Sequence, residues 1–339
     1  MAPMTRSRAI GNIPNKLMTE YYFQRAGAGL IITEGTAPTP DGLGYPRIPG
    51  IFSQEQMDGW KDITAAVHKS NSKIFLQLMH TGRIGHNDNL PDEVLLAGPS
   101  EIKAAGQIFT DIAGLQDHSQ PTALTTEGVK EVISGHVTAA KNAIKAGFDG
   151  IELHGANGYL LDQFLRDGSN QRADAYGGTI QNRARFPLEV VEGVLDVWDP
   201  QQVGYKLSPH FAGYSMSDSN PVATFSYLAK ELNKRRLAYL HIGEAIAGPM
   251  AAPAGTVRVT PLLREIFSGT LIANGGYDAH SANAVIARGE ADLVAFGVPF
   301  LANPDLPARY WRKAPLNSPD YTTFYAGEEK GYVDYPALA

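Results

Sequence analysis

The chain contains no cysteine among its 339 residues. This absence excludes a disulfide framework, a thiolate-bound iron–sulfur cluster and a cysteine nucleophile. Basic charge is also not in excess, since the formal net charge is −6, whereas a nucleic-acid backbone favours a basic face. No apolar run approaches the ~20 residues of a membrane-spanning helix, and the first residues have no apolar core of the signal-peptide kind. We therefore expect a soluble cytoplasmic protein that binds neither nucleic acid nor membrane.

The chain does contain a regular alternation of short apolar runs and amphipathic segments, with 43% hydrophobic residues available for a core. Such alternation predicts the α/β class and a closed (β/α)8 barrel, a TIM barrel, with residues 1–339 as one domain. A doubly wound sheet would require a Gly-x-Gly-x-x-Gly turn after the first strand, and none is present. We expect strands at 1–5 (the tail of a strand), 29–33, 73–78, 148–153, 203–207, 238–242, 271–274 and 292–296.

Helices are expected between these strands, at 15–27, 54–69, 160–165, 222–235, 260–267, 279–288 and 303–312, with another running from a cap at Thr126 to Gly147. Residues 81–125 are expected to form a long loop. A connection of that length usually has a function.

Three polar side chains, those of His154, Asn157 and Tyr159, follow the fourth expected strand. In a parallel barrel, active sites are built at the carboxyl ends of the strands. His154 and Asn157 can both donate hydrogen bonds to one electron-rich group, and Tyr159 can supply a proton to a molecule lying over it. Taken alone, a His in this place can equally be a structural hydrogen-bonding residue. A metal site is disfavoured, because no second His or carboxylate falls nearby at ligand spacing.

Other strand ends carry groups suited to a flat ring with a phosphate tail. Asn274-Gly-Gly276 and Gly297 follow the last two strands, where barrels commonly bind phosphate through backbone amides. The alternative is that Gly275 and Gly276 form only a tight turn. Thr5, Gln77 and Lys206 end three further strands and offer a hydroxyl, an amide and a cation. FMN would use this whole set, whereas a sugar phosphate would not.

Several motifs in this order resemble the Old Yellow Enzyme family. The resemblance runs from the first residue to Tyr332-Val-Asp-Tyr-Pro336 and is greatest to bacterial ene-reductases with Thr rather than Cys beside the flavin. The motifs are Met1-Ala-Pro-Met-Thr-Arg-Ser-Arg-Ala9, Thr33-Glu-Gly-Thr36, Gln77-Leu-Met-His-Thr-Gly-Arg83, His154-Gly-Ala-Asn-Gly-Tyr159, Asn170-Gln-Arg-Ala-Asp-Ala-Tyr-Gly-Gly178, Asn182-Arg-Ala-Arg-Phe186 and Phe300-Leu-Ala-Asn-Pro-Asp305.

The resemblance implies an FMN-dependent enzyme that takes hydride from NADPH and, in a ping-pong cycle, reduces an activated C=C bond of an enone, enal, maleimide or nitroalkene. His154 and Asn157 would hold the carbonyl or nitro oxygen of the substrate, with hydrogen bonds that strengthen in the transition state. Hydride would reach the β-carbon from the flavin, and Tyr159 would protonate the α-carbon as a general acid.

The resemblance also assigns the surroundings of the cofactor and the substrate. Tyr45, Met79 and Tyr325 would line the substrate pocket together with the three residues just named, although each could equally be a packing residue. Met79 stands where the family often has Trp, which suggests a roomier pocket. His80 and Arg83 are expected to be structural or to touch the long loop. The residues expected around FMN are Pro3, Met4, Thr5, Gly35, Gln77, His154, Asn157, Lys206, Asn274, Gly275, Gly276, Gly297 and Val298.

Three departures from the family pattern affect these expectations. Lys206 replaces the usual Arg and keeps the charge but not the planar fork. Val298 replaces an Arg that would hold the phosphate, a charge-assisted contact of about 1.5–3 kcal/mol, so we expect weaker FMN binding. The family also has a lead-in before Met1; here we expect either a start further upstream or a less covered barrel floor.

Two other hypotheses stay open at this point. One is an FMN-holding barrel with little turnover, such as a flavin store or an inactive relative, as Lys206 and Val298 suggest. The other is a barrel without flavin, such as an aldolase or lyase, for which Lys206 is the only suitably placed Lys. The physiological substrate, the preference for NADPH over NADH and the choice between monomer and homodimer are not determined by these patterns.

Overall fold

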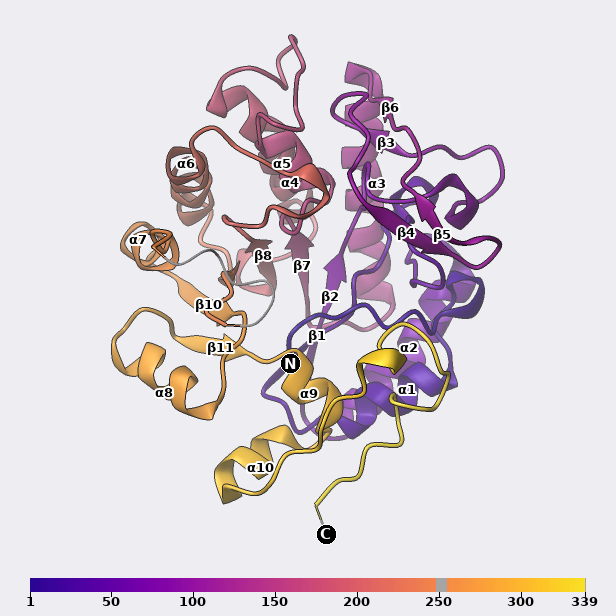
Figure 1. Cartoon of the computed structure of the whole chain (residues 1–339), viewed down its shortest axis with the longest axis vertical. Coiled ribbons are helices and arrows are strands. Elements are labelled where there is room, and N and C mark those ends of the chain that lie inside the picture. The colour runs from indigo at the N-terminus through magenta and orange to yellow at the C-terminus, as the bar shows by residue number, and fades with distance from the viewer. Residues whose placement is uncertain (248–254, 339) are drawn as a thin grey trace.

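The computed structural model describes residues 1–247 and 255–338. Its main feature is a curled, seven-stranded parallel sheet in the order β1-β2-β7-β8-β9-β10-β11. The strands are neighbours in the sheet in the same order in which they follow one another along the chain, as in a barrel (Figure 1). The strands are β1 Leu30–Ile32, β2 Lys73–Leu78, β7 Gly150–His154, β8 Val203–Leu207, β9 Tyr239–Gly243, β10 Thr270–Asn274 and β11 Leu293–Ala295.

The first residues of the chain lie between the two edges of this sheet. The backbone N–H of Ala2 donates to the carbonyl of Phe296, just after β11, at 2.9 Å, and the N–H of Ile32 in β1 donates to the carbonyl of Met1 at 3.2 Å. These residues form no regular strand, but they hydrogen-bond on both sides as a first strand would. The predicted (β/α)8 barrel is therefore confirmed, with an irregular first strand.

Helices surround the sheet largely as predicted, with three differences. Helix α5 was not predicted at all, and it contains Pro187. The helix expected at 303–312 is present as α10, and a short helix that was not predicted, α9, precedes it. Thr125, not Thr126, caps α3, because its side chain accepts from the N–H of Gly128. The helices are α1 Lys16–Gln24, α2 Gln54–His68, α3 Thr126–Lys145, α4 Leu160–Leu165, α5 Ile180–Leu195, α6 Pro221–Lys234, α7 Thr260–Ile266, α8 Ala279–Ala287, α9 Val298–Ala302 and α10 Leu306–Arg312.

The long connection between β2 and α3 is not a plain loop. It carries a parallel pair, β3 Ala97–Gly98 with β6 Thr122–Ala123, and an antiparallel hairpin, β4 Gln107–Thr110 with β5 Gly114–Asp117. Both lie beside the upper ends of β2 and α3 in Figure 1. No helix in the described part of the chain is both long and apolar enough to cross a membrane.

The interior of the barrel has an apolar floor and a polar layer above it. Phe75 and Tyr239 stack at 5.9 Å and pack with Ile32 and Ile272 at the amino-terminal half of the strands. Gly150 and Gly204 make room for these rings, because a Cβ at either glycine would lie within 2.4 Å of ring atoms. Two residues further along each strand the same face is polar, because side chains alternate along a strand. That polar layer underlies the site described next.

Candidate active site

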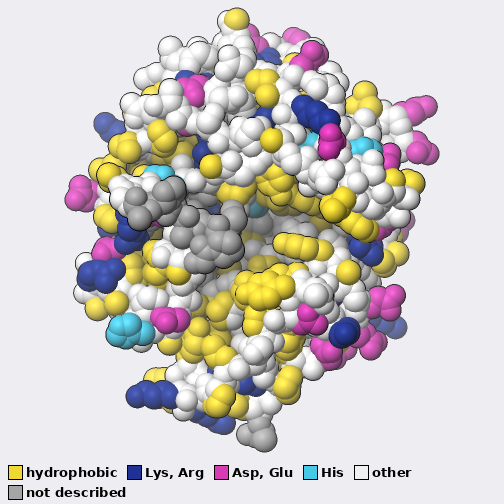
Figure 2. All heavy atoms as spheres, viewed as in Figure 1, with side chains coloured by type: hydrophobic (Ala, Val, Ile, Leu, Met, Phe, Trp, Pro, Cys, Tyr) yellow, Lys and Arg dark blue, Asp and Glu magenta, His cyan; other side chains and the backbone are white. Residues whose placement is uncertain are grey.

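The predicted site residues converge at the carboxyl ends of the strands. His154, the last residue of β7, pairs in register with Lys206 of β8, which pairs in turn with His241 of β9. Gln77 of β2 pairs with Glu152 of β7. The surface is hollowed near the middle of the face drawn in Figure 2, and hydrophobic side chains gather round the hollow.

His154 and Asn157 carry buried polar atoms that nothing in the described chain satisfies. His154 is 6% exposed and its Nδ1 has no hydrogen-bond partner among the described residues; the same holds for Oδ1 of Asn157. Burial, with smaller contributions from the charge of Lys206 and from His241, holds the pKa of His154 well below its usual range. A neutral imidazole offers one N–H donor. Buried polar groups without partners are costly in a folded chain, so these two atoms indicate a place for an outside ligand.

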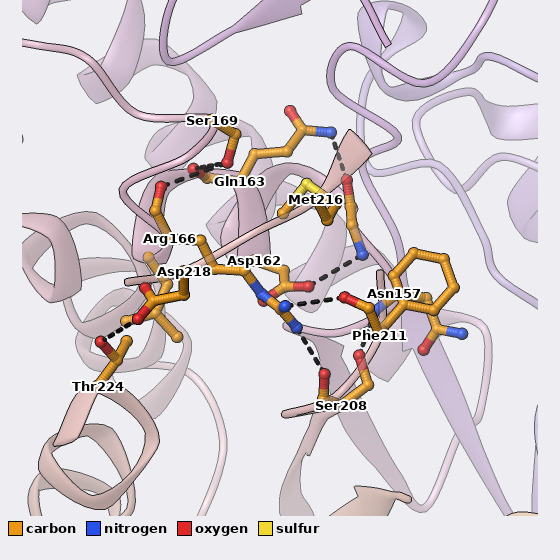
Figure 3. Close-up of polar contacts among 12 residues, drawn as sticks. Asn157, Asp162, Gln163, Arg166, Ser169, Ser208, Phe211, Met216, Asp218 and Thr224 are labelled. Carbon is orange, nitrogen blue, oxygen red and sulfur yellow. Dashed lines mark hydrogen bonds and ion pairs between the residues drawn. The ribbon is translucent and has the colours of Figure 1, made fainter. Parts of the chain in front are cut away.

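A buried network fixes the backbone beneath Asn157, and it was not predicted. The residue has φ of 58°, and its N–H donates to Oγ of Ser208 at 2.7 Å. Arg166, fully buried, donates to Oδ1 of Asp162 at 2.8 Å and to the carbonyls of Ser208 and Phe211 at 2.5 and 2.9 Å. Helix α4 is thereby tied to the loop after β8. In Figure 3 the Asn157 carboxamide points away from this network, which leaves it available to a ligand.

Tyr159 stands at the start of α4 with its ring edge-on to His154, the two centroids 4.8 Å apart. Its hydroxyl donates to that of Tyr45 at 3.2 Å. Burial raises the pKa of Tyr159 above its ordinary value, so the hydroxyl keeps its proton at neutral pH. Met79 is buried in the same cluster and packs against Gly35, where a Cβ would lie 2.3 Å from its sulfur. Tyr325 lies at the exposed rim, 62% accessible.

The polar layer inside the barrel centres on Glu152, which was not among the predicted site residues. Its carboxylate accepts from Nε2 of Gln77 at 2.7 Å and contacts Nδ1 of His241 at 2.8 Å. Burial alone would raise the pKa of Glu152, but the partners His241, Lys206 and Gln77 outweigh it and lower that pKa. The alternation in Gly150–His154 could have revealed Glu152, since it puts residues 152 and 154 on one face. Nothing local identified His241.

Lys206 is the cation of this layer. It is 6% exposed, and within the described ranges no carboxylate lies within 4.0 Å of its ammonium group and no acceptor hydrogen-bonds it. Burial lowers its pKa, and the charge of Glu152 partly offsets this. A buried cation in this state favours an acceptor from outside the chain.

The predicted phosphate end lies at β10 and β11. Asn274 is fixed by its Nδ2, which donates to the carbonyl of Ala295 at 2.8 Å. Gly275 and Gly276 have φ of 126° and 73°, and a Cβ at either would lie 2.5–2.6 Å from backbone atoms of residues 245 and 247. The turn therefore requires both glycines whether or not phosphate binds. Gly297 lies beside Met4, with Val298 starting α9. Pro3 and Thr5 are half-buried beside Met4 on the irregular first strand.

These groups fit FMN at its ring end. The ammonium of Lys206 and the carboxamide of Gln77 would meet the pyrimidine edge. Nδ1 of His154 and Oδ1 of Asn157, which have no partner in the described part of the chain, lie at the same mouth. The phosphate end fits FMN less well, because it offers little positive charge. Residues 245–257 contain no Lys, Arg or His, and Arg258 is already paired with Glu244 and Glu290 at 3.5 and 2.9 Å. Backbone amides would carry most of the phosphate binding there.

Comparison with known proteins gives a consistent result. Residues 1–317 match the model of the NADH:flavin oxidoreductase / NADH oxidase family. The chain is 44% identical over 345 residues to 12-oxophytodienoate reductase 1 of Oryza sativa subsp. japonica, covering 100% of this chain and 88% of the relative. Among solved structures it resembles morphinone reductase (46% identity, TM-score 0.95, 100% and 91% covered) and the old yellow enzyme homologue from Zymomonas mobilis (38%, 0.96, 100% and 95%). A morphinone reductase complex with tetrahydroNAD is also similar (45%, 0.94, 100% and 93%).

Proposed function

This chain belongs to the NADH:flavin oxidoreductase / NADH oxidase family and is an FMN-dependent oxidoreductase of the Old Yellow Enzyme type, acting on C=C bonds; from that premise we propose which residues do the chemistry and on what substrates. The substrates are small alkenes made electron-poor by a carbonyl or nitro group: enones, enals, maleimides and nitroalkenes. The observation that carries the proposal concerns two buried atoms, Nδ1 of His154 and Oδ1 of Asn157, which have no hydrogen-bond partner among the described residues. The ring of Tyr159 lies edge-on to His154.

His154 and Asn157 bind the substrate oxygen. His154 can present the N–H of a neutral imidazole, because burial lowers its pKa, and Asn157 can present an N–H of its Nδ2, since its Oδ1 can only accept. Because negative charge grows on that oxygen as the alkene accepts hydride, the two hydrogen bonds become stronger in the transition state than in the ground state, which accelerates the reaction. The network through Arg166 and Ser208 keeps the Asn157 backbone in place, so the donor needs no reorganisation.

Tyr159 donates the proton to the α-carbon. Its O–H lies beside His154, and burial raises its pKa, so the acid form is present throughout the neutral range. A phenol of high pKa is a weak acid in general, but the carbanion that forms next to a carbonyl group is a strong base, and proton transfer to it is favourable. Tyr45, Met79 and Tyr325 shape the space in which the alkene lies.

FMN supplies a two-electron carrier that takes hydride from the nicotinamide and passes it to the β-carbon of the alkene. Lys206 and Gln77 would hold the polar edge of its ring, and Pro3, Met4, Thr5 and Gly35 would lie around the ring. The phosphate would be bound by Asn274, Gly275, Gly276, Gly297 and Val298. The hydride donor is a nicotinamide, in keeping with the tetrahydroNAD complex of morphinone reductase. That complex does not distinguish NADPH from NADH, and we propose NADPH only because the resemblance to Old Yellow Enzymes implies it.

Anaerobic half-reactions test this proposal. NADPH should bleach the yellow protein, and cyclohexenone should restore the colour. The Tyr159→Phe variant should be reduced by NADPH at the normal rate but reoxidised by cyclohexenone about 10²-fold or more slowly, the usual contribution of a positioned acid. Equal slowing of both half-reactions would exclude Tyr159 as the proton donor. A yellow protein that NADPH does not bleach would favour the flavin store.

A further inference from the structure

The proton donor lies at one end of a row of three tyrosine hydroxyls. Tyr159 Oη is 3.2 Å from Tyr45 Oη, and Tyr45 Oη is 3.4 Å from Tyr214 Oη. The three residues come from different parts of the chain: the start of α4, the loop after β1 and the loop after β8. Tyr214 was not among the predicted site residues, and nothing above gives its hydroxyl a role.

The far end of the row reaches toward solvent. Tyr214 is only partly buried and lies in a short 3-10 turn, Gly213–Ser215. Tyr159 and Tyr45 are also partly buried, but they are packed against the apolar cluster that contains Met79 and Leu43. Among the described residues, the hydrogen bond from the Tyr159 hydroxyl goes to Tyr45, so the row of hydroxyls offers a polar path from Tyr159 to Tyr214.

The position of Tyr214 is held at a conformational cost. Tyr214 and Ser215 have φ of 57° and 56°, and two consecutive left-handed residues other than Gly are unusual. Arg83, fully buried, donates to the carbonyls of both at 3.0 and 3.3 Å and to the carbonyl of Ile102 in the long connection at 3.0 Å. The prediction that Arg83 is structural and touches that connection agrees with these contacts. Strain kept in place by a buried Arg indicates that the location of the Tyr214 side chain matters.

We propose that Tyr45 and Tyr214 form a proton relay that resupplies Tyr159 after each turnover. The inference rests on the proposed function, in which Tyr159 is the donor. In the donating step the O–H bond of Tyr159 breaks and a C–H bond forms at the α-carbon, leaving a phenolate on Tyr159. That phenolate takes the proton of Tyr45, Tyr45 takes that of Tyr214, and Tyr214 takes one from water. One proton passes from solvent to product, and the relay residues are neither oxidised nor reduced.

The hydrogen bonds can run in either direction, as a relay requires. A hydroxyl both donates and accepts, and its hydrogen rotates to suit. Tyr159 donates to Tyr45 in the resting arrangement. When its hydrogen turns to the substrate, Tyr45 can donate to Tyr159 and Tyr214 to Tyr45. Burial raises the pKa of both Tyr159 and Tyr45, so a phenolate formed there draws a proton back strongly.

Removing only the terminal hydroxyl tests the relay. With Tyr214→Phe, the first reoxidation of pre-reduced enzyme by cyclohexenone should proceed at the wild-type rate, because Tyr159 starts protonated. Later turnovers should slow roughly tenfold, a part of the 10²–10⁴ that positioned proton transfer contributes. A transient tyrosinate absorbance should follow the first turnover and be absent in Tyr159→Phe/Tyr214→Phe. Tyr321→Phe, at an exposed residue outside the row, serves as the matched control.

Two further variants keep the outcomes distinct. Tyr45→Phe breaks the row next to the donor and should show the same slow later turnovers, and Tyr214→His, which restores a proton-carrying group, should recover most of the rate. Normal later turnovers in Tyr214→Phe, with Tyr159→Phe impaired, would overturn the relay and leave the donor in place. Normal reoxidation in Tyr159→Phe would overturn the proposed donor itself, and the relay with it.

Discussion

Two regions of this molecule bury positive charge, and they do so in opposite ways. Near the chain ends, Arg6, Arg8 and Arg25 are 0–3% exposed and donate to backbone carbonyls. In the barrel, Lys206 is 6% exposed, and in the described ranges it has no hydrogen-bond acceptor. The three guanidiniums donate to several carbonyls of the chain, although Nη1 of Arg6 has no partner among the described residues. The ammonium donates to no acceptor in those ranges.

The difference separates a structural role from a binding role. The carbonyls that accept from the three arginines include those of Phe324, Gly331 and Tyr332 in the last part of the chain, so the arginines tie that part to the first helix and the N-terminal motif. Figure 1 shows the last part of the chain, in yellow, beside α1 and below the sheet. The barrel cation holds no part of the chain in place. We propose that this cation serves a bound ligand, and the contrast leads to the following expected effects, beginning with the largest.

Replacing Arg25 by Leu should lower the free energy of unfolding by about 3–5 kcal/mol, because it leaves the buried carbonyls of Phe300, Leu301 and Tyr332 without their donor. Denaturant unfolding of the flavin-free protein measures the change. Arg312→Leu, at an exposed site, should stay near wild type. If Arg25→Leu lowered the free energy of unfolding no more than Arg312→Leu, the structural role of the buried arginines would be contradicted.

Glu34, which lies in the arginine region, should make the stability of the protein depend on pH. Burial raises its pKa to about 7, although Arg6 and Tyr22 act in the opposite direction. Between the unfolded value near 4.5 and 7, the folded state binds more protons than the unfolded state, so stability should fall as pH rises through this window, by about 2–3 kcal/mol. Unfolding curves at pH 5 and pH 8 should show this difference in wild type and lose it in Glu34→Gln. Glu55→Gln, at the surface, should behave as wild type.

A new cation, placed at the phosphate end, should strengthen cofactor binding. Val298→Arg should tighten FMN binding by about 1.5–3 kcal/mol, the value of a charge-assisted contact. Riboflavin, which lacks the phosphate, should bind the variant and the wild type equally well. Fluorescence titration of the flavin-free protein measures both affinities. Equal FMN affinity in the two proteins would show that the backbone amides already suffice.

Lys206→Met should have the smallest effect on stability and a clear effect on binding. Removing a buried cation without an acceptor should change the free energy of unfolding of the flavin-free protein by less than about 1 kcal/mol, or raise it. FMN and riboflavin affinity should both fall, because the ring loses its cation. If Lys206→Met destabilised the flavin-free protein as much as Arg25→Leu, the contrast between the two regions would be wrong.

Much of the candidate site could be predicted because barrel topology turns sequence position into spatial position. A residue at the end of a parallel strand must lie at the mouth, so His154, Gln77, Lys206 and Asn274 could be placed from strand boundaries alone. Tyr214, Arg83 and Arg166 could not. They lie in loops, and only the folded path of two separate connections brings the Tyr214 hydroxyl beside that of Tyr45. Helix α5 escaped prediction because Pro187 interrupts its pattern.

The sequence alone determined the alternation of strands and helices, the polar groups at the strand ends and the family pattern, because these depend on local periodicity and on the order of residues. Only the tertiary structure decided which buried charges are satisfied. Whether a buried cation finds a carbonyl acceptor depends on the path of backbone that is distant in the sequence, as at Arg25 and Lys206. No local pattern of residues predicts such a hydrogen bond.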